Sequence, residues 1–556
     1  MYGKMHSACL YGIEGVMIGV EIDLANGLPQ TSIIGLPDSA IREAVERVRA
    51  AVKNCGYRYP QQRVTINLAP ADLRKEGSAF DLAIALGILT TSGQLDMPEA
   101  EQLLLIGELA LDGSLRPVTG VLSMVEAARR NGMKGVLVPK GNAAEASLIS
   151  GMTVYTAEHL RQLPPPDADR ELLTVRPLST FSSQLGELPF PVTVSTSQTE
   201  KDRPPVKVLS LNHLRFIPDY AHTDSGSSEV NMMAEDYSDV LGQNHVKRAL
   251  MIAAAGMHNI VLMGPPGTGK TMLIKRLPGI LPELDDNESL EVTKIFSSAG
   301  KLKEANSGLL RSRPFRSPHH TISAAGLIGG GGIPKPGEVS LAHRGVLFLD
   351  ELPEFSRNVL EVLRQPLEDG VVTISRARAA FTFPAQFLLA CSMNPCSCGY
   401  LGSIGTTKRC TCSPAKIAQY RGKISGPLLD RIDMQVDVPR PRDWEGQGAS
   451  ISSSEMRTEV LKVQAIQKER YRGLPISWNS ELSGTALRRY ARLQKDGRQL
   501  LNDILESLGL SMRAHDRIIK LARTIADLEG EADIGSSHLA EAVQYRNLDR
   551  QVVVDE

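Results

Sequence analysis

The stretch from Gly264 to Thr271, Gly-Pro-Pro-Gly-Thr-Gly-Lys-Thr, constrains the fold of this chain more than any other. It follows the apolar run 259–263 and precedes a segment, 272–277, that is typical of a helix. A strand, a glycine-rich loop and a helix in this order form a phosphate-binding P-loop, in which backbone N–H groups surround the phosphates. We expect Lys270 to bring a positive charge to them and the Thr271 hydroxyl to ligate Mg²⁺. The predicted nucleotide-binding residues are Gly264, Pro265, Pro266, Gly267, Thr268, Gly269, Lys270 and Thr271.

Two adjacent carboxylates, Asp350 and Glu351, follow a second apolar run at 345–349. They would end a buried strand near the phosphates, where Asp350 can hold the Mg²⁺ and Glu351 can orient and deprotonate the attacking water. Adjacent acids at a strand end can instead cap a helix. A third apolar run, 387–391, is followed by Asn394, whose amide can lie between the acids and the γ-phosphate and sense hydrolysis. The three runs together predict a site for ATP hydrolysis.

Charges of both signs nearly cancel, since 62 Lys and Arg and 63 Asp and Glu residues give a formal net charge of −1. No global basic field indicates nucleic-acid binding, so a DNA site would have to be local. The sequence has no apolar run of membrane-spanning length, and its first residues lack the pattern of a signal peptide. We expect a soluble, cytoplasmic protein that contacts no membrane.

The 556 residues are too many for one hydrophobic core, given about 150 residues per domain. Residues 166–236 are rich in Ser, Thr, Pro and acidic residues, which is typical of a partly disordered linker. Near the C-terminus, apolar side chains recur at helical spacing, as at Ile518, Ala522 and Ile525. We expect an α/β domain, a linker, a nucleotide-binding α/β module and a helical lid, at residues 1–165, 166–236, 237–441 and 442–556 respectively.

Within the first of these parts, strand-like and helix-like patterns alternate. Residues 16–22 and 64–68 are rich in apolar and β-branched residues and predict strands. Residues 39–54 predict an amphipathic helix, because apolar side chains recur along one stripe of it. The stripe consists of Ile41, Val45, Val48 and Val52.

Four of the seven cysteines crowd into one segment and form two Cys-x-Cys pairs. Four thiolates in two clustered pairs match a closed tetrahedral zinc site, and soft sulfur ligands favour Zn²⁺ over Mg²⁺. Four reduced cysteines in a loop are the alternative. Since the first pair begins two residues after Asn394, a zinc loop would be tied to the nucleotide-sensing strand. The predicted zinc ligands are Cys396, Cys398, Cys410 and Cys412.

The order of these parts resembles that of the AAA+ ATPases. The segment 426–433, Gly-Pro-Leu-Leu-Asp-Arg-Ile-Asp, is similar to the one that supplies the family's arginine finger, which implies that Arg431 stabilises phosphoryl charge in a neighbouring subunit. An ion pair of Arg431 with Asp430 or Asp433 is the alternative. The resemblance also implies that Arg513 senses the γ-phosphate and couples it to lid rotation. It places Gln243 beside the adenine ring.

Between the P-loop and the acidic pair lies an insertion with a glycine run at 329–332 and Lys335, which resembles that of the magnesium-chelatase and MCM clade. After the acids, 371–383 alternates β-forming residues around a basic tip and predicts a hairpin. Arg376 and Arg378 would share one face of it. In a ring, these side chains and Lys335 could line a pore and contact DNA phosphates. A solvated or ion-paired edge is the alternative.

The whole arrangement resembles the ComM (YifB-type) magnesium-chelatase-like AAA+ family. That resemblance implies a Lon-protease-like (ribosomal-S5-domain-2-like) N-terminal domain before the AAA+ module and the helical lid. The segments 76–86 and 113–122 resemble those that carry Lon's serine and lysine, but the matching positions are Ala79 and Leu122. Without a nucleophile and its base, acyl transfer lacks its first step, so we expect an ATP hydrolase that is not a protease.

Members of this family are implicated in ATP-driven branch migration of DNA during integration of incoming strands. The resemblance therefore implies a homohexameric helicase that uses ATP and Mg²⁺ and acts on branched or single-stranded DNA in homologous recombination and natural transformation. A chelatase-type or regulatory AAA+ ATPase that remodels proteins without a DNA role is the alternative.

Overall fold

The computed structural model describes residues 1–163, 207–208, 211–217, 235–302, 308–332, 334–376, 379–402, 408–440, 450–508 and 511–546. Most of the predicted linker and the predicted boundary at 441 lie outside these residues, so the boundaries stay predictions. The chain divides into two compact units. The first consists of 1–223 with 297–308, and the second of 224–296 with 309–556.

The first unit contains a seven-stranded sheet with the strand order β10-β9-β6-β1-β2-β4-β3. The long strands β1 and β2 pair antiparallel, and β2 pairs antiparallel with β4. Both strands predicted here are confirmed, within β2 and β4. The strands are β1 Tyr2–Tyr11, β2 Glu14–Ala25, β3 Gln30–Ile34, β4 Arg63–Ala69, β6 Leu103–Leu105, β9 Gly135–Pro139 and β10 Thr153–Ala157.

Four helices accompany this sheet, and α1 spans the predicted residues 39–54. The Asp38 side chain accepts a hydrogen bond from the Ile41 N–H at 2.8 Å and caps its first turn. Helix α2 is buried along most of its length and forms the centre of this unit's core. The helices are α1 Ser39–Asn54, α2 Asp81–Thr91, α3 Val121–Arg130 and α4 Ala143–Ser147, and two short strand pairs are β5 Leu95–Asp96 with β11 Lys207–Val208 and β7 Glu108–Leu109 with β8 Leu115–Arg116.

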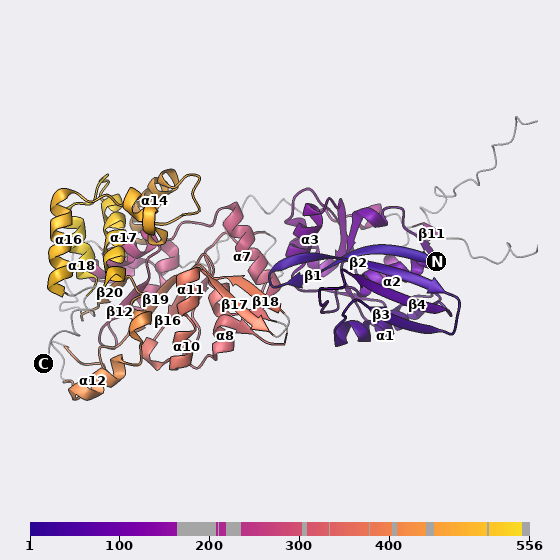
Figure 1. Ribbon diagram of the computed structural model, residues 1–556, viewed down its shortest axis with the longest axis horizontal. Coiled ribbons are helices and arrows are strands. Elements are labelled where there is room, and N and C mark those ends of the chain that lie inside the picture. Colours follow the sequence, from indigo (N-terminus) through magenta and orange to yellow (C-terminus); the bar gives the residue numbers. More distant parts are fainter. Residues whose placement is uncertain are drawn as a thin grey trace, which may run out of the picture. The chain divides into compact units, whose positions relative to one another are not determined.

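The second unit is built on a five-stranded parallel sheet with the order β13-β16-β19-β12-β20 (Figure 1). Strand β12 lies between β19 and β20, with Ile260 opposite both Ala390 and Met434. Because the strands are parallel, the loops after β12, β16 and β19 leave the sheet at one edge. The strands are β12 Ile260–Met263, β13 Phe315–Arg316, β16 Val346–Leu349, β19 Leu388–Met393 and β20 Met434–Asp437.

Helices and two hairpins connect these strands. Helix α5 precedes β12, and α6 follows the P-loop as predicted. The predicted hairpin at 371–383 is confirmed as β17 and β18. The helices are α5 Asn244–Gly256, α6 Lys270–Lys275, α7 Asp286–Ser298, α8 Ala324–Ile328, α9 Glu338–Leu341, α10 Arg357–Glu361, α11 Arg364–Asp369, α12 Pro414–Arg421 and α13 Gly426–Leu429. The hairpins are β14 Gly329–Gly330 with β15 Lys335–Pro336, and β17 Val371–Arg376 with β18 Ala379–Pro384.

The region after residue 450 is helical, and Figure 1 shows α14, α16, α17 and α18 gathered beside the sheet of the same unit. Its apolar side chains join those of the sheet and α5 in one hydrophobic core. Ile518, Ala522 and Ile525 are buried in α17, as their spacing predicts. The helices are α14 Ser453–Arg470, α15 Gly484–Tyr490, α16 Lys495–Leu508, α17 Met512–Leu528 and α18 Ser536–Gln544.

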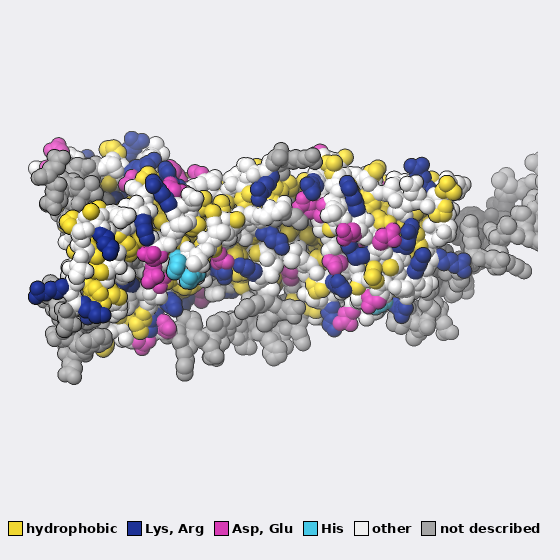
Figure 2. Space-filling view, turned by 90° about the horizontal axis from the view of Figure 1, so that it is seen from below, with side chains coloured by type: hydrophobic (Ala, Val, Ile, Leu, Met, Phe, Trp, Pro, Cys, Tyr) yellow, Lys and Arg dark blue, Asp and Glu magenta, His cyan; other side chains and the backbone are white. Residues whose placement is uncertain are grey.

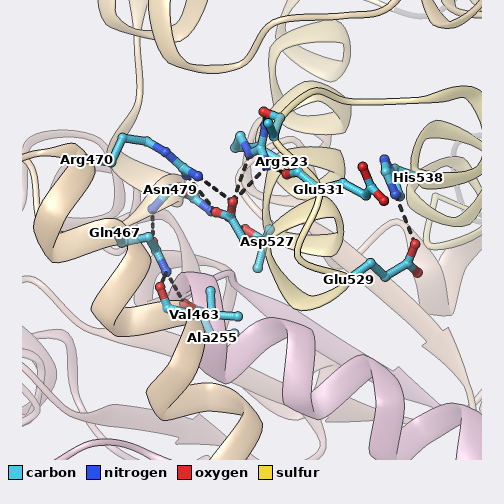
Figure 3. A network of polar contacts seen from close by, with 12 residues as sticks. Ala255, Val463, Gln467, Arg470, Asn479, Arg523, Asp527, Glu529, Glu531 and His538 are labelled. Carbon is cyan, nitrogen blue, oxygen red and sulfur yellow. Dashed lines mark hydrogen bonds and ion pairs between the residues drawn. The ribbon is translucent and has the colours of Figure 1, made fainter.

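A buried polar network joins these helices to α5 (Figure 3). The Gln467 amide donates to the Ala255 carbonyl at 2.7 Å and accepts from the Asn479 N–H at 2.7 Å. Asn479 donates in turn to Asp527 at 2.9 Å, and Arg470 donates to the same carboxylate at 2.7 Å. Every member has a partner, so the network ties the C-terminal helices to α5 rather than leaving them free.

None of the helices in the described part of the chain is both long and apolar enough to cross a membrane. All seven cysteines are free, as expected for a chain without a disulfide framework.

Candidate active site

The P-loop leaves the sheet after β12 and turns into α6. Gly267 and Gly269 have φ values of +76° and +85°, a region that favours glycine. The Lys270 ammonium is buried and donates to the carbonyls of Gly264 at 2.7 Å and Pro265 at 2.9 Å. Burial lowers the pKa of Lys270, and the carboxylates of the acidic pair oppose that shift. The P-loop thus holds the Lys270 ammonium at its centre.

The acidic pair lies at the end of β16, next to the P-loop. Asp350 accepts a hydrogen bond from the Thr271 hydroxyl at 3.0 Å, so the two predicted Mg²⁺ ligands are in contact. The Ser392 hydroxyl donates to the other oxygen of Asp350. Sequence reasoning missed Ser392, because its role depends on β19 lying beside β16. These oxygens form the hard donor set that Mg²⁺ prefers.

Glu351 has an exposed side chain and a φ of +54°, which is unusual for a residue with a Cβ. Its N–H donates to Asp350 at 3.1 Å and to the Ser392 hydroxyl at 3.3 Å, and these bonds support the conformation. Strained backbone held by its neighbours is common at catalytic positions. The geometry turns Glu351 away from the strand and leaves its carboxylate accessible.

Asn394 follows β19 and meets the P-loop. Its amide oxygen accepts a hydrogen bond from the Lys270 ammonium at 3.3 Å. The structure therefore brings together the lysine, the acidic pair and the predicted sensor, which come from the ends of three adjacent strands. Its proposed role as a sensor of hydrolysis stays a prediction.

Gln243 lies just before α5, with a φ of +57°. Its amide nitrogen donates to the Pro439 carbonyl at 2.6 Å. Its amide oxygen is buried and has no partner among the described residues. Pro439 follows Val438, whose carbonyl packs against the Gly264 that opens the P-loop. An unpaired buried acceptor at this place fits the amino group of an adenine.

Arg431 lies at the opposite edge of the sheet from the P-loop. Asp433, two residues after Arg431, accepts a hydrogen bond from the Asn259 N–H at 2.9 Å. Asn259 directly precedes β12, whereas the P-loop follows the other end of that strand. The side chain of Arg431 is only 8% exposed and pairs with Glu368, while one of its N–H groups donates to the Pro427 carbonyl at 2.6 Å. The alternative ion pair with Asp430 or Asp433 is thus not the one observed.

Arg513 lies on the same side as Arg431. Arg431 is the main cause of the lowered pKa of Glu368, and the charge of Arg513 contributes to that shift. One turn further along α17, the guanidinium of Arg517 lies 3.5 Å from Asp433. Neither Arg431 nor Arg513 therefore lies at the sheet edge that carries its own P-loop. A pocket of about 420 Å³ at this edge is lined by both cations and carboxylates, among them Arg431, Arg517 and Glu368.

The two hairpins bring together two of the three predicted DNA-contact residues. Exposed Arg376, at the end of β17, donates to the Gly331 carbonyl at 3.0 Å. Gly331 follows β14, which pairs with β15 at exposed Lys335. Arg378 lies outside the described residues. Figure 2 shows basic and acidic side chains interspersed over the face it presents, so the basic character is local.

The four cysteines predicted to bind zinc come together, with all four sulfurs within 4.8 Å of one another. The Cys396 sulfur lies 3.3 Å from that of Cys398 and 3.8 Å from that of Cys410. A tetrahedral site with Zn–S bonds of about 2.3 Å needs sulfurs nearly this far apart. The backbone N–H of Tyr400 lowers the pKa of the Cys398 thiol, which favours the thiolate that binds metals. The cluster fits a metal ion.

In the first unit, the positions that correspond to Lon's serine and lysine are buried. Ala79 is 6% exposed, and Leu122 is fully buried in α3. The neighbouring Ser78 hydroxyl donates to the Glu108 carboxylate. The nearby Lys75 is fully buried, and its ammonium donates to the Pro70 carbonyl. The contacts of Ser78 are thus those of a structural serine. The likeness of this unit to Lon protease stays a prediction.

Comparison with known families matches three parts of the chain. The family descriptions are "Magnesium chelatase, subunit ChlI" for residues 236–445, "Subunit ChlI of Mg-chelatase" for 20–142 and "Magnesium chelatase, subunit ChlI C-terminal" for 450–546. Each matched range overlaps one of the predicted parts, and the predicted boundaries stay predictions.

Similar proteins extend over almost the whole chain. Competence protein ComM of Haemophilus influenzae is 42% identical over 549 residues, which cover 98% of this chain and 97% of that protein. The uncharacterized protein YifB of Escherichia coli is 39% identical over 549 residues, 99% of this chain and 98% of that protein. The magnesium-chelatase 38 kDa subunit of Rhodobacter capsulatus is 23% identical over 330 residues, 54% of this chain and 84% of that subunit.

Proposed function

Since the chain belongs to the ComM and YifB type of the magnesium-chelatase-like AAA+ ATPases, we propose that it is an ATP-driven motor that moves branched DNA. The assembled nucleotide site supports the first half of this proposal. Lys270 binds the phosphates, Thr271 and Asp350 hold the Mg²⁺, and Gln243 recognises the adenine. Glu351 takes a proton from the attacking water while Asn394 orients the γ-phosphate.

The proposed motor is a ring, most simply a homohexamer. The observation that carries this is the place of Arg431 and Arg513 at the sheet edge away from their own P-loop. A strand of four residues is about 13 Å long, so a side chain at one edge does not reach phosphates at the other. A neighbouring subunit can present its P-loop to these arginines, and Arg431 would leave Glu368 to stabilise the phosphoryl group.

The DNA half of the proposal is supported by the contact between the two hairpins. Because Arg376 is anchored to Gly331 beside Lys335, two exposed cations from separate insertions face one region. Repeated around a ring, they would line a pore with positive charge suited to a phosphate backbone. The name of the competence protein relative agrees with a role in integrating transforming DNA by homologous recombination.

A protein-remodelling ATPase is the second candidate. The family descriptions name a chelatase subunit, and the acidic and basic side chains interspersed in Figure 2 do not favour nucleic acid over protein. The ComM relative is 42% identical and covers 98% of this chain, whereas the chelatase subunit is 23% identical and covers 54% of it. Protein remodelling is therefore the weaker candidate function.

Four finer assignments belong to the same proposal. The four-cysteine cluster holds Zn²⁺ as a structural ion, because its donors are soft and its four sulfurs lie within 4.8 Å of one another. The first unit is a scaffold without peptidase activity, because Ser78 bonds to a carboxylate rather than to an amine that could activate it. The helical C-terminal region acts as the lid, and the motor works in the cytoplasm.

The deciding experiment measures ATP hydrolysis with and without forked or three-stranded DNA, together with strand displacement. We expect DNA to stimulate hydrolysis and branch points to move. The variant Arg376→Ala with Lys335→Ala should weaken DNA binding across sequences and lower its salt dependence. The control is Arg472→Ala with Lys462→Ala, which also removes two cations, at side chains of the C-terminal region that are 78% and 62% exposed. ATP hydrolysis that ignores DNA, with no branch movement, would contradict the DNA role.

A further inference from the structure

The cysteine cluster touches the P-loop through one glycine. Gly399 follows Cys398 directly and is buried, with a φ of +83°. A Cβ added to it would lie 2.8 Å from Cδ of Pro266 in the P-loop and 3.9 Å from Cγ of Asn394. Only a residue without a side chain can bring the loop this close. The turn that holds the sulfurs is therefore packed against the phosphate-binding loop itself.

The same turn is fixed from its other side by α12, which begins just after the last cysteine. Arg421, near the end of α12, donates to the Pro395 carbonyl at 3.2 Å. The Gly399 N–H donates to the Cys396 carbonyl at 3.0 Å, which closes the turn. Asn394, the partner of the Lys270 ammonium, directly precedes Pro395. A continuous set of contacts thus runs from the sulfurs to the lysine of the P-loop.

A metal bound by the four sulfurs would join the segment 396–398 to the segment 410–412, so that neither could move without the other. Without the metal, the segment that carries Gly399 would have to become ordered against the P-loop each time a nucleotide binds. That ordering costs conformational entropy and lowers the apparent affinity for the nucleotide.

We propose that the cysteine loop, by which we mean residues 396–399 and 410–412, is a positioning element of the ATP site. When its metal is bound, Gly399 supports Pro266 and Asn394 is held toward Lys270, and the affinity for ATP depends on the occupancy of the metal site. This rests on the ATP and zinc binding proposed above, and it is independent of the DNA role.

The test compares two glycines that follow Cys398 in the chain. Gly399→Ala and Gly402→Ala impose similar backbone strain, since their φ values are +83° and +71°. Only the Cβ at position 399 meets the P-loop, because nothing lies within 4 Å of a Cβ at position 402. We expect Gly399→Ala to bind a fluorescent ATP analogue at least about tenfold more weakly, or about 1.4 kcal/mol, while the zinc content and melting temperature of the nucleotide-free protein match those of Gly402→Ala. Gly402→Ala should bind it like the unaltered protein.

Two further variants separate packing from folding. Adding Pro266→Ala to Gly399→Ala removes the ring atoms that the new Cβ meets, so the double variant should lose less affinity than the two single changes predict together. Cys410→Ser with Cys412→Ser should lose the zinc, measured by metal analysis, and should weaken ATP binding about as much as Gly399→Ala.

The proposal would be overturned by equal ATP affinity of Gly399→Ala and Gly402→Ala. Metal-free protein that binds ATP as tightly as the zinc-loaded protein would overturn it as well, as would a chain that takes up no zinc. None of these measurements involves DNA, so they can fail while the motor function holds, and they can succeed while it does not.

Discussion

Side-chain hydrogen bonds from three adjacent strands assemble the nucleotide site. Lys270, Asp350 and Asn394 are predictable from the sequence because each follows an apolar run that forms a strand. Ser392 and Gly399 are not predictable from the sequence. Ser392 lies on β19 and bonds to Asp350 at the end of β16, and Gly399 matters because it has no side chain. Residues that act through neighbouring strands carry no sequence signal of their own.

Two substitutions should separate nucleotide binding from hydrolysis. Lys270→Ala removes the cation that the loop holds at its centre, and we expect it to abolish ATP binding and turnover. Glu351→Gln keeps the size of the side chain but removes its basicity, so it should bind ATP normally and hydrolyse it at least about a hundredfold more slowly. Equilibrium binding of an ATP analogue and phosphate release measure the two effects. Normal hydrolysis by Glu351→Gln would refute its role as the base.

The C-terminal helices and the sheet form one packed body at the scale of elements. The helical spacing in α17 predicts its buried face, yet the partners of that face come from α5, α14 and α18. The network of Figure 3 adds a direct link from Ala255 to Asp527 through Gln467 and Asn479. Any lid motion must therefore move these elements together or break a buried network.

Asp527→Asn tests how firmly this body is held. The Asp527 side chain is 1% exposed and accepts hydrogen bonds from Arg470 and Arg523. Its neutralisation leaves the buried guanidinium of Arg523 and the partly buried one of Arg470 without a counter-charge. We expect the free energy of unfolding of this unit to fall by about 3 kcal/mol. Denaturant unfolding followed by tryptophan fluorescence measures it.

Glu529→Gln is the matched control, since it removes a nearby carboxylate that is 44% exposed and pairs with Arg248 and His538. It should cost less than about 1 kcal/mol. Equal costs for the two variants would show that the buried network does not stabilise the unit.

At the scale of the whole molecule, the candidate catalytic groups lie at two opposite edges of one sheet. The P-loop, the acidic pair and Asn394 lie at one edge, and Arg431 with Arg513 at the other. In the proposed ring, a site divided in this way would be completed where one subunit meets the next.

Mixing two inactive variants tests this division. Lys270→Ala keeps Arg431, and Arg431→Ala keeps an intact P-loop, so about a quarter of the interfaces in a randomly assembled equal mixture would be complete. We expect each variant alone to lack ATP hydrolysis and the mixture to regain a measurable part of it. If the mixture hydrolyses no more ATP than its components do, Arg431 does not act on a neighbour.

The sequence by itself determined the kinds of element and the chemistry at their ends, because strand length, helical periodicity and P-loop spacing are local properties of the chain. It also predicted that the four cysteines belong together, and the structure confirms that their sulfurs meet. Only the tertiary structure decided which strands are neighbours, and hence that Ser392 bonds to Asp350, that Arg431 pairs with Glu368 and faces away from its own P-loop, and that the cysteine turn supports Pro266. These contacts join residues far apart in the chain, and they follow from the order and direction of parallel strands. The P-loop therefore predicts what this protein binds, while the sheet around it determines which groups of the same subunit can reach the bound nucleotide.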